Sequence, residues 1–179
     1  SEQTGTIGTD GAFFLFFPEY LLELYVKRPE AVRRGYLHML LHCLYLHLFR
    51  EDQEDRRLWN LACDIAVEQI ISREKIPILE TGGDAKKIRE KVFHILGDRS
   101  DSAEKICRKL KEQAFPFHLE ELEEAFHFDD HTLWDTCTGE KGKRTKEKWN
   151  KLLSYTAANR QDHRKRRGSQ KGDQKEETG

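Results

Sequence analysis

Apolar residues recur three and four positions apart along most of the chain, a spacing typical of amphipathic helices. The pattern predicts a helix that begins at residue 18 and further helices over about 29–50, 58–72, 84–96, 101–113, 119–126 and 145–160. Pro18 and Pro29 can open their helices because the first turn does not need the N–H that proline lacks. Gly97 follows one of these segments and can end it.

The N-terminal segment has a different pattern. Residues 4–11 and 12–17 read as two short strands around Asp10-Gly11, a pair favoured where a two-residue turn needs positive φ. The phenylalanine run at 13–17 does not alternate with polar residues, so we expect it to be buried on both faces or to cover a helix. The sequence therefore predicts an α+β fold that is mostly helical, with a small N-terminal β-hairpin.

The most unusual stretch is residues 35–50, which is rich in leucine yet carries His38, His42 and His47. His38 and His42 lie one helical turn apart on the same face, where two imidazoles can reach one ion. Burying an unpaired polar ring costs roughly 1–3 kcal/mol, so the two rings need a common partner, and a metal is one candidate. His47 lies about 140° further round, and an unbroken helix points it elsewhere. Residues 44–46 offer no glycine to break that helix.

The helix predicted at 58–72 carries a polar stripe of Asn60, Asp64 and Glu68, spaced four residues apart. A short connection makes this helix antiparallel to the histidine helix and brings Asp64 towards the histidine pair. Two histidine nitrogens and one carboxylate form a known catalytic zinc set. The alternative is a metal-free core in which His38 and His42 hydrogen-bond to the carboxylates, and the spacing leaves both interpretations open.

His131 is a candidate further ligand, because it lies in a polar loop beside aromatic residues and could approach the metal from outside. The alternative, which we favour from the sequence, is that Asp129 caps a turn and His131 pairs locally with Asp130, since aspartate commonly bonds its own local backbone. His47 is expected to bond a carboxylate or a backbone carbonyl instead of joining the site.

Five blocks of the sequence together resemble a known family. They are residues 9–11, 38–42 with His47, 58–64, 102–106 and 129–134. Their residues and order are similar to those of the predicted metal-dependent peptidases with a VWA-like C-terminal domain. The resemblance implies that residues 1–160 form a zincin-like N-terminal domain that contains a metal-binding helix. It implies that residues 161–179 form a basic, disordered linker to a missing C-terminal domain. It also implies two partners, a MoxR-type AAA+ ATPase and the VWA-like domain.

One position departs from the family pattern, in which the motif is His-Glu-x-x-His and the glutamate is the general base of peptide hydrolysis. Here that position is Met39, whose thioether cannot take a proton. We therefore expect a zinc-binding, metallopeptidase-like domain with weak or no activity on a protein or peptide substrate. Glu68 could replace the base only if the two helices brought it to the same place. The alternative function is a non-catalytic interaction module.

The charge distribution and the cysteines indicate the environment in which the protein works. Residues 141–179 hold 13 Lys and Arg against 5 Asp and Glu, whereas residues 1–140 hold 18 against 27. The basic tail suits a solvated linker better than a nucleic-acid arm. The four cysteines form no CxxC pair, and no apolar run approaches the roughly 20 residues of a membrane span. These features predict a reducing, cytoplasmic setting, and the start at Ser1 suggests a piece of a longer protein.

Overall fold

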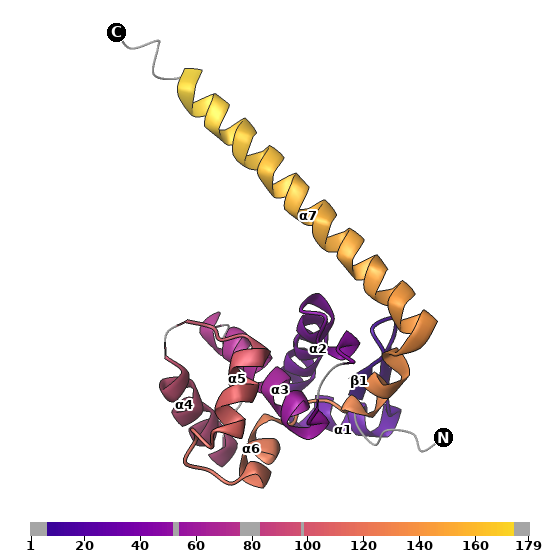
Figure 1. The fold of residues 1–179 in the computed structure, drawn as a ribbon, viewed down its shortest axis with the longest axis vertical. Helices are drawn as coiled ribbons and strands as arrows, with labels where there is room; N and C mark the ends of the chain where they lie inside the picture. Colours follow the sequence, from indigo (N-terminus) through magenta and orange to yellow (C-terminus); the bar gives the residue numbers. More distant parts are fainter. Residues whose placement is uncertain (1–6, 52–53, 76–82, 98, 174–179) are drawn as a thin grey trace.

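The computed structural model describes residues 7–51, 54–75, 83–97 and 99–173 of the 179-residue chain, with side chains as far as residue 157. The described part is mostly helical, with one two-stranded antiparallel sheet (Figure 1). Its elements are β1 (Ile7–Thr9), β2 (Phe14–Phe16), α1 (Pro18–Lys27), α2 (Pro29–Leu44), η1 (His47–Phe49), α3 (Arg56–Arg73), α4 (Asp84–Leu96), α5 (Ala103–Lys111), α6 (Leu119–Phe126), η3 (His131–Cys137) and α7 (Gly139–Asp173). The predicted mostly helical α+β fold with an N-terminal hairpin is confirmed.

Helix α3 forms the centre of the molecule and packs against α2, α5 and α6. The carboxylate of Asp55 caps its start by accepting a hydrogen bond from the Leu58 N–H at 3.0 Å. Leu37 and Leu41 of α2 pack on the Val67 and Ile71 cluster of α3. This apolar contact fixes the helix pair in a register that sets the α2 histidines beside the polar stripe of α3.

The hairpin pairs Ile7 with Phe16 and Thr9 with Phe14. In the turn between the strands, the Asp10 carboxylate accepts hydrogen bonds from the backbone N–H groups of Ala12 and Phe13, each at 2.9 Å. The phenylalanine run is not buried on both faces, because Phe13 and Phe16 are 66% and 55% exposed. The other alternative, that the run covers a helix, is met by Phe14, whose ring centroid lies 4.9 Å from that of Tyr36 on α2. A two-stranded sheet covers the body with one strand, β1, and leaves β2 at the surface.

The histidine helix ends earlier than the sequence predicts. Helix α2 stops at Leu44, Leu46 adopts a left-handed conformation with φ of 59°, and a separate 3-10 turn follows. The prediction of an unbroken helix to residue 50 is therefore wrong. A left-handed non-glycine residue costs about 1–2 kcal/mol. Burying Leu48 and Phe49, which are 2% and 6% exposed, returns about 1.5–3 kcal/mol each and outweighs that cost.

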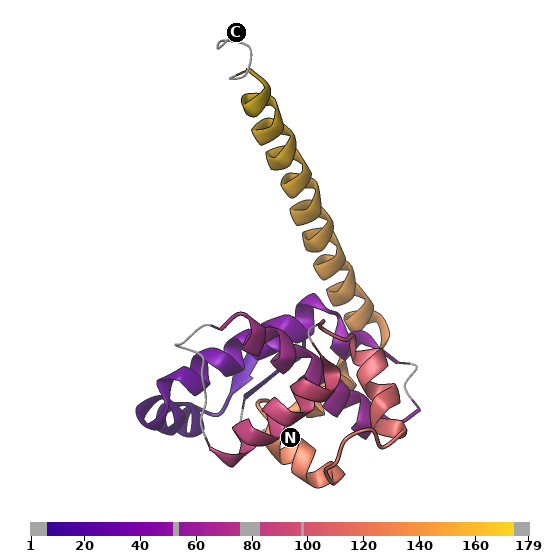
Figure 2. The ribbon, with the colours of Figure 1, turned by 90° about the vertical axis from the view of Figure 1, so that its left-hand side faces the viewer.

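Helix α7 projects away from the body in both views (Figures 1 and 2). Its first turns are anchored by Trp149, whose indole N–H donates to the Gly11 carbonyl at 2.8 Å, and by the buried Thr145. The helix begins at Gly139 and continues to Asp173, so the predicted helix over 145–160 is extended at both ends. The division of the chain at residue 160 stays a prediction.

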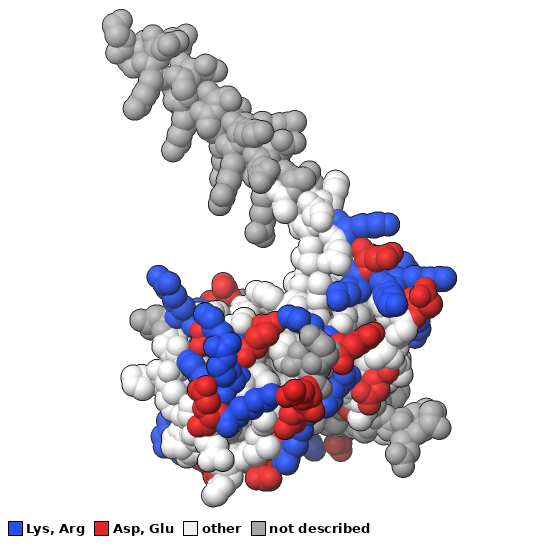
Figure 3. Space-filling model, viewed as in Figure 1, with Lys and Arg blue, Asp and Glu red and all other residues white. Residues whose placement is uncertain are grey.

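The surface carries charges of both signs, and the cysteines are buried. Basic and acidic side chains are interspersed over the face of the body that Figure 3 shows. All four cysteines, Cys43, Cys63, Cys107 and Cys137, are buried free thiols. Within the described part of the chain, every helix is too short or too polar to cross a membrane.

Candidate metal centre

Five side chains from three parts of the chain converge on one point. His38 and His42 come from α2, and Asp64 comes from α3. Asp129 lies just before η3, and His131 is the first residue of η3. One ligand atom from each, an imidazole nitrogen or a carboxylate oxygen, lies within 4.8 Å of all the others. The two α2 rings have no exposed surface, and the other three side chains are at most 11% exposed. Helix, helix and loop together thus present a compact set of three nitrogens and two oxygens.

The distances between these atoms suit a coordination sphere. The Nε2 atoms of His38 and His42 are 2.8 Å apart, and each lies 3.2 Å from Asp64 Oδ1. His131 Nε2 lies 3.1 Å from Oδ1 of both Asp64 and Asp129. Ligands at bond lengths of about 2.0–2.2 Å from one ion are separated by roughly 2.8–3.6 Å in tetrahedral or octahedral arrangements. These five spacings fall within that range, and all five ligand atoms lie within 4.8 Å of one another.

The N-terminal hairpin positions the loop that supplies Asp129. The Asp130 N–H donates to the Ile7 carbonyl at 2.7 Å, and Gly8 and Asp130 form a parallel bridge. A Cβ on Gly8 would lie 2.8 Å from the Asp130 carbonyl oxygen, so the glycine permits this close approach. Along this extended segment, Asp129 and His131 share a face because side chains alternate. The hairpin therefore aims both residues at the helices.

Glu68 and Arg34 hold the ring of His38. Glu68 Oε1 lies 2.9 Å from His38 Nδ1, the nitrogen that faces away from the cluster. Its other oxygen accepts from Arg34 Nε at 2.8 Å and also contacts Arg34 Nη2. A carboxylate that accepts from Nδ1–H keeps the Nε2 lone pair directed at the metal position. Glu68 is thus engaged on the far side of His38, and the structure does not place it as a replacement base.

His47 contacts the cluster through His42. Their Nδ1 atoms are 3.0 Å apart, so one nitrogen must donate and the other accept. Burial and the neighbouring His38 lower the pKa of His42 to about 4, and burial together with His42 lowers the pKa of His47 to about 2, so both rings are neutral. If His42 donates, its Nε2 lone pair faces the cluster. His47 lies outside the ligand set but can fix the tautomer of His42.

The carboxylates and imidazoles of the cluster shift one another's pKa values. Burial opposes ionisation of Asp64 and Asp129, but the adjacent His131 charge outweighs it and holds both pKa values well below the usual range. Burial acts to lower the pKa of His38, yet hydrogen bonds to three carboxylates raise it well above its ordinary value. Against the same burial, the Asp64 and Asp129 charges raise the pKa of His131 to about 10. The ionised Asp64 and Asp129 carboxylates thus supply the negative charge that would hold a divalent cation.

An unpaired oxygen supports the fit of a metal ion. Asp129 Oδ2 is buried and, among the described residues, has no hydrogen-bond partner. A buried acceptor without a partner is costly, and a cation or ordered water satisfies it. Asp64, Asp129 and His131 also line a surface cavity of about 340 Å³, which Asn60 and Arg56 border. The cluster therefore has a route to solvent beside α3.

The structure brings together the metal ligands that the sequence predicts and adds one more aspartate. His38, His42 and Asp64 meet as the sequence predicts, and His131 joins them. The favoured pairing of His131 with Asp130 is wrong, because Asp130 caps the start of η3 through the Thr132 N–H at 2.8 Å while His131 contacts Asp129. Asp129 was missed as a ligand. Its spacing of two residues from His131 in an extended loop is the signal that could have found it.

Together, the helical fold and the buried histidine–aspartate cluster define a metallopeptidase-like domain. The chain matches the model of the family described as "Putative metallopeptidase domain" over residues 1–178, and it belongs to that family. No curated protein and no solved structure gave a significant match to it.

Proposed function

We propose that the chain is a zinc-binding, metallopeptidase-like domain in which His38, His42, Asp64, Asp129 and His131 hold one metal ion. The observation that carries this proposal is the convergence of the five ligand atoms within 4.8 Å. A set of imidazole nitrogens and carboxylate oxygens suits the borderline character of zinc. When bound, the ion would supply Lewis-acid chemistry at the cavity beside Asp64.

We further propose that this domain hydrolyses peptides weakly or not at all. Met39 follows the first histidine, is 4% exposed and has no proton to exchange. Glu68 is bound by Arg34 and by His38 Nδ1, which keeps its carboxylate away from the cavity. Loss of a general base commonly costs about 10²–10⁴ in rate. The chain thus retains ligands for an ion while the usual proton carrier is missing.

Assays with casein and a peptide library test this proposal in the zinc-loaded wild type, Met39→Glu and His42→Ala. We expect no chelator-sensitive turnover from the wild type and a gain of about 100-fold or more over background in Met39→Glu. Met39→Gln is the matched control, because it places a polar group of similar shape at the same buried position without a base. Robust wild-type turnover that disappears in His42→Ala would contradict the proposal.

A second candidate function is a non-catalytic interaction module that works with a MoxR-type AAA+ ATPase and a VWA-like domain. The observation that favours it is helix α1, which has no buried residue and exposes Leu22, Tyr25 and Val26 at 65%, 57% and 80%. Contiguous exposed apolar surface marks interaction sites. Binding of a purified MoxR-type ATPase should weaken in Leu22→Ser with Val26→Ser. The exposed Leu152→Ser serves as control, and unchanged binding in the double variant argues against α1 as the contact.

A further inference from the structure

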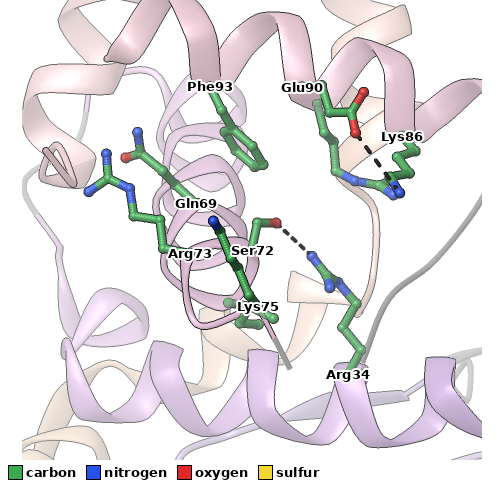
Figure 4. Close-up of a pocket in the computed structure, with 10 residues that line it drawn as sticks. Arg34, Gln69, Ser72, Arg73, Lys75, Lys86, Glu90 and Phe93 are labelled. Carbon is green, nitrogen blue, oxygen red and sulfur yellow. Dashed lines mark hydrogen bonds and ion pairs between the residues drawn. The ribbon is translucent and has the colours of Figure 1, made fainter. Parts of the chain in front are cut away.

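A cavity of about 370 Å³ lies where α2, the end of α3 and the first turns of α4 meet (Figure 4). Most of its charged side chains have partners within the protein. Arg34 donates to the Ser72 hydroxyl at 3.1 Å, and Lys86 lies 4.0 Å from Glu90. Arg73 donates to a backbone carbonyl and to a hydroxyl, each at 2.7 Å. Surface groups that await a partner lie instead on the N-terminal hairpin.

Strand β1 makes its main-chain pairs on two sides. The Ile7 carbonyl accepts from the Asp130 N–H at 2.7 Å, on the side away from β2. Main-chain groups alternate in direction along an antiparallel strand, so the next residue, Gly8, directs its groups at β2. The cross-strand partner of Gly8 is Leu15. The hydrogen-bonded pair at the centre of the hairpin is therefore Gly8 with Leu15.

The outer edge of β2 is open. Because Leu15 directs its N–H and C=O groups at β1, the neighbouring Phe14 and Phe16 direct theirs the opposite way. Within the described part of the chain, β2 pairs with β1 alone, and no backbone hydrogen bond from outside the hairpin reaches Phe14 or Phe16. Proteins usually protect such an edge with charged residues, proline or a bulge. Residues 12–17 contain no charge and no proline, and their register with β1 is continuous.

The side chains around this edge are apolar and between 36% and 66% exposed. They are Phe13, Leu15, Phe16, Phe17 and, from α2, Tyr36, whose ring centroid lies 4.9 Å from that of a β2 phenylalanine. A fully buried aromatic side chain covers about 150–250 Å², so these partly exposed groups offer roughly 500 Å². Two such surfaces together bury roughly 1,000 Å², which reaches the lower bound for a specific protein interface.

A second copy of the chain fits this edge because the open groups are symmetric about Leu15. When two β2 strands pair antiparallel about a two-fold axis at Leu15, Phe14 of each copy faces Phe16 of the other. Each outward N–H then meets a C=O of the other strand. The uncharged residues 12–17 bring no like charges together. We propose that the chain forms a homodimer through β2, in which the two hairpins join into one four-stranded antiparallel sheet.

This inference goes beyond the proposed metal function and does not depend on it. The metal ligands and the exposed side chains of α1 are unchanged in the variants that test it. Dimerisation is measured as mass, without an activity assay, so the dimer and the metal function can fail separately.

Sedimentation equilibrium of the full chain over a range of concentrations tests the dimer. We expect wild type to pass from the monomer mass of 21.1 kDa to twice that mass, with a dissociation constant of about 1–100 μM. Leu15→Lys and Leu15→Glu each place like charges opposite each other at the axis and should weaken dimerisation at least about tenfold. An equimolar mixture of the two variants places opposite charges there and should dimerise at least as tightly as wild type.

Phe16→Pro tests the main-chain pairing. Proline has no N–H, and an edge strand tolerates it where the lost N–H faces outward. The Gly8–Leu15 pair of the hairpin is kept, so we expect this variant to be a monomer with the melting temperature of the monomeric Leu15→Lys. A Phe16→Pro dimer as tight as that of wild type would overturn the main-chain pairing.

Leu152→Lys and Leu152→Glu are the matched controls, because Leu152 is 50% exposed on α7 and carries the same substitutions away from the hairpin. Both should dimerise as wild type does. A wild-type chain that stays monomeric up to about 500 μM overturns the proposal. Equal dimerisation of wild type and the Leu15 variants overturns the use of β2. A mixture of Leu15→Lys and Leu15→Glu that stays as monomeric as either variant alone overturns the two-fold pairing at Leu15.

Discussion

At the scale of single residues, the site depends on groups that contact the ligands and do not themselves reach the metal position. Glu68 holds His38 through Nδ1, and His47 holds His42 in the same way. Such contacts orient the ring and set which nitrogen carries the lone pair. The two carboxylates of the polar stripe on α3 therefore have different roles. Asp64 lies in the cluster, and Glu68 contacts His38 on the side that faces away from it.

Substitution of Glu68 tests this division. Glu68→Gln keeps an acceptor for His38 and removes the charge that Arg34 and His38 share, so we expect zinc affinity to fall about 10–100-fold. Competition with a chromophoric chelator measures the change. The exposed Glu120→Gln is the matched control, since it removes a carboxylate that pairs with Arg57 at the surface. Equal affinity of Glu68→Gln and wild type would show that the contact is dispensable.

Asp10 gives a pH-dependent prediction away from the metal ligands. Burial opposes its ionisation, but the Ala12 and Phe13 N–H groups and Lys141 together lower its pKa. A lowered folded pKa means that the charged form stabilises the fold above the unfolded value of about 3.9, and that this contribution is lost as pH falls through the folded pKa. Asp10→Asn should therefore reduce the free energy of unfolding at pH 7 and differ less from wild type below pH about 4.

Urea unfolding at several pH values measures this difference. Asp84→Asn is the control, because the Asp84 side chain is 91% exposed and, among the described residues, pairs with Lys87 of its own helix. A gap between wild type and Asp10→Asn that stays constant down to pH 2 would contradict the role assigned to the Asp10 charge.

At the scale of elements, the hairpin acts as the support of the ligand loop. Gly8→Ala places a Cβ 2.8 Å from the Asp130 backbone oxygen, which must move and take Asp129 with it. We expect lower zinc affinity and a loss of about 1–3 kcal/mol in stability. Gly35→Ala is the comparison, because its Cβ meets the end of the Ile7 side chain, at 2.5 Å, instead of backbone. A larger loss of zinc affinity in Gly35→Ala than in Gly8→Ala would contradict this support role.

The element scale also shows what the sequence could predict. Helical spacing predicted α4 to the residue and α3 to within two residues, because each has a clear apolar face and Gly97 ends α4. It failed at the end of α2, where the left-handed Leu46 follows from the burial of Leu48 and Phe49. It also failed to pair Asp129 with the helices, because that contact depends on a bridge between residues 8 and 130, which no local pattern contains. Local signals predict elements, whereas long-range contacts complete the site.

At the scale of the whole molecule, helix α7 has two parts, a start that packs against the body and a remainder that projects from it. The Trp149 hydrogen bond to the Gly11 carbonyl and the burial of Thr145 anchor its first turns, and the helix then leaves the body (Figure 2). The composition of residues 161–179 is too polar to form a core, so we expect limited proteolysis to trim them without change in the melting temperature. A fall of several degrees on trimming would show that this segment packs against the domain.

The central claim is that five side chains from the two helices and the ligand loop bind one metal ion. Elemental analysis of untagged, dialysed protein tests it most directly, in wild type, His38→Ala, Asp64→Ala, Asp129→Ala and the exposed control His94→Ala. The account predicts one zinc ion per chain in wild type and in the control, and a clear loss in the other three variants. Wild type without metal, or full occupancy in both His38→Ala and Asp64→Ala, would contradict it and favour a hydrogen-bonded core of imidazoles and carboxylates.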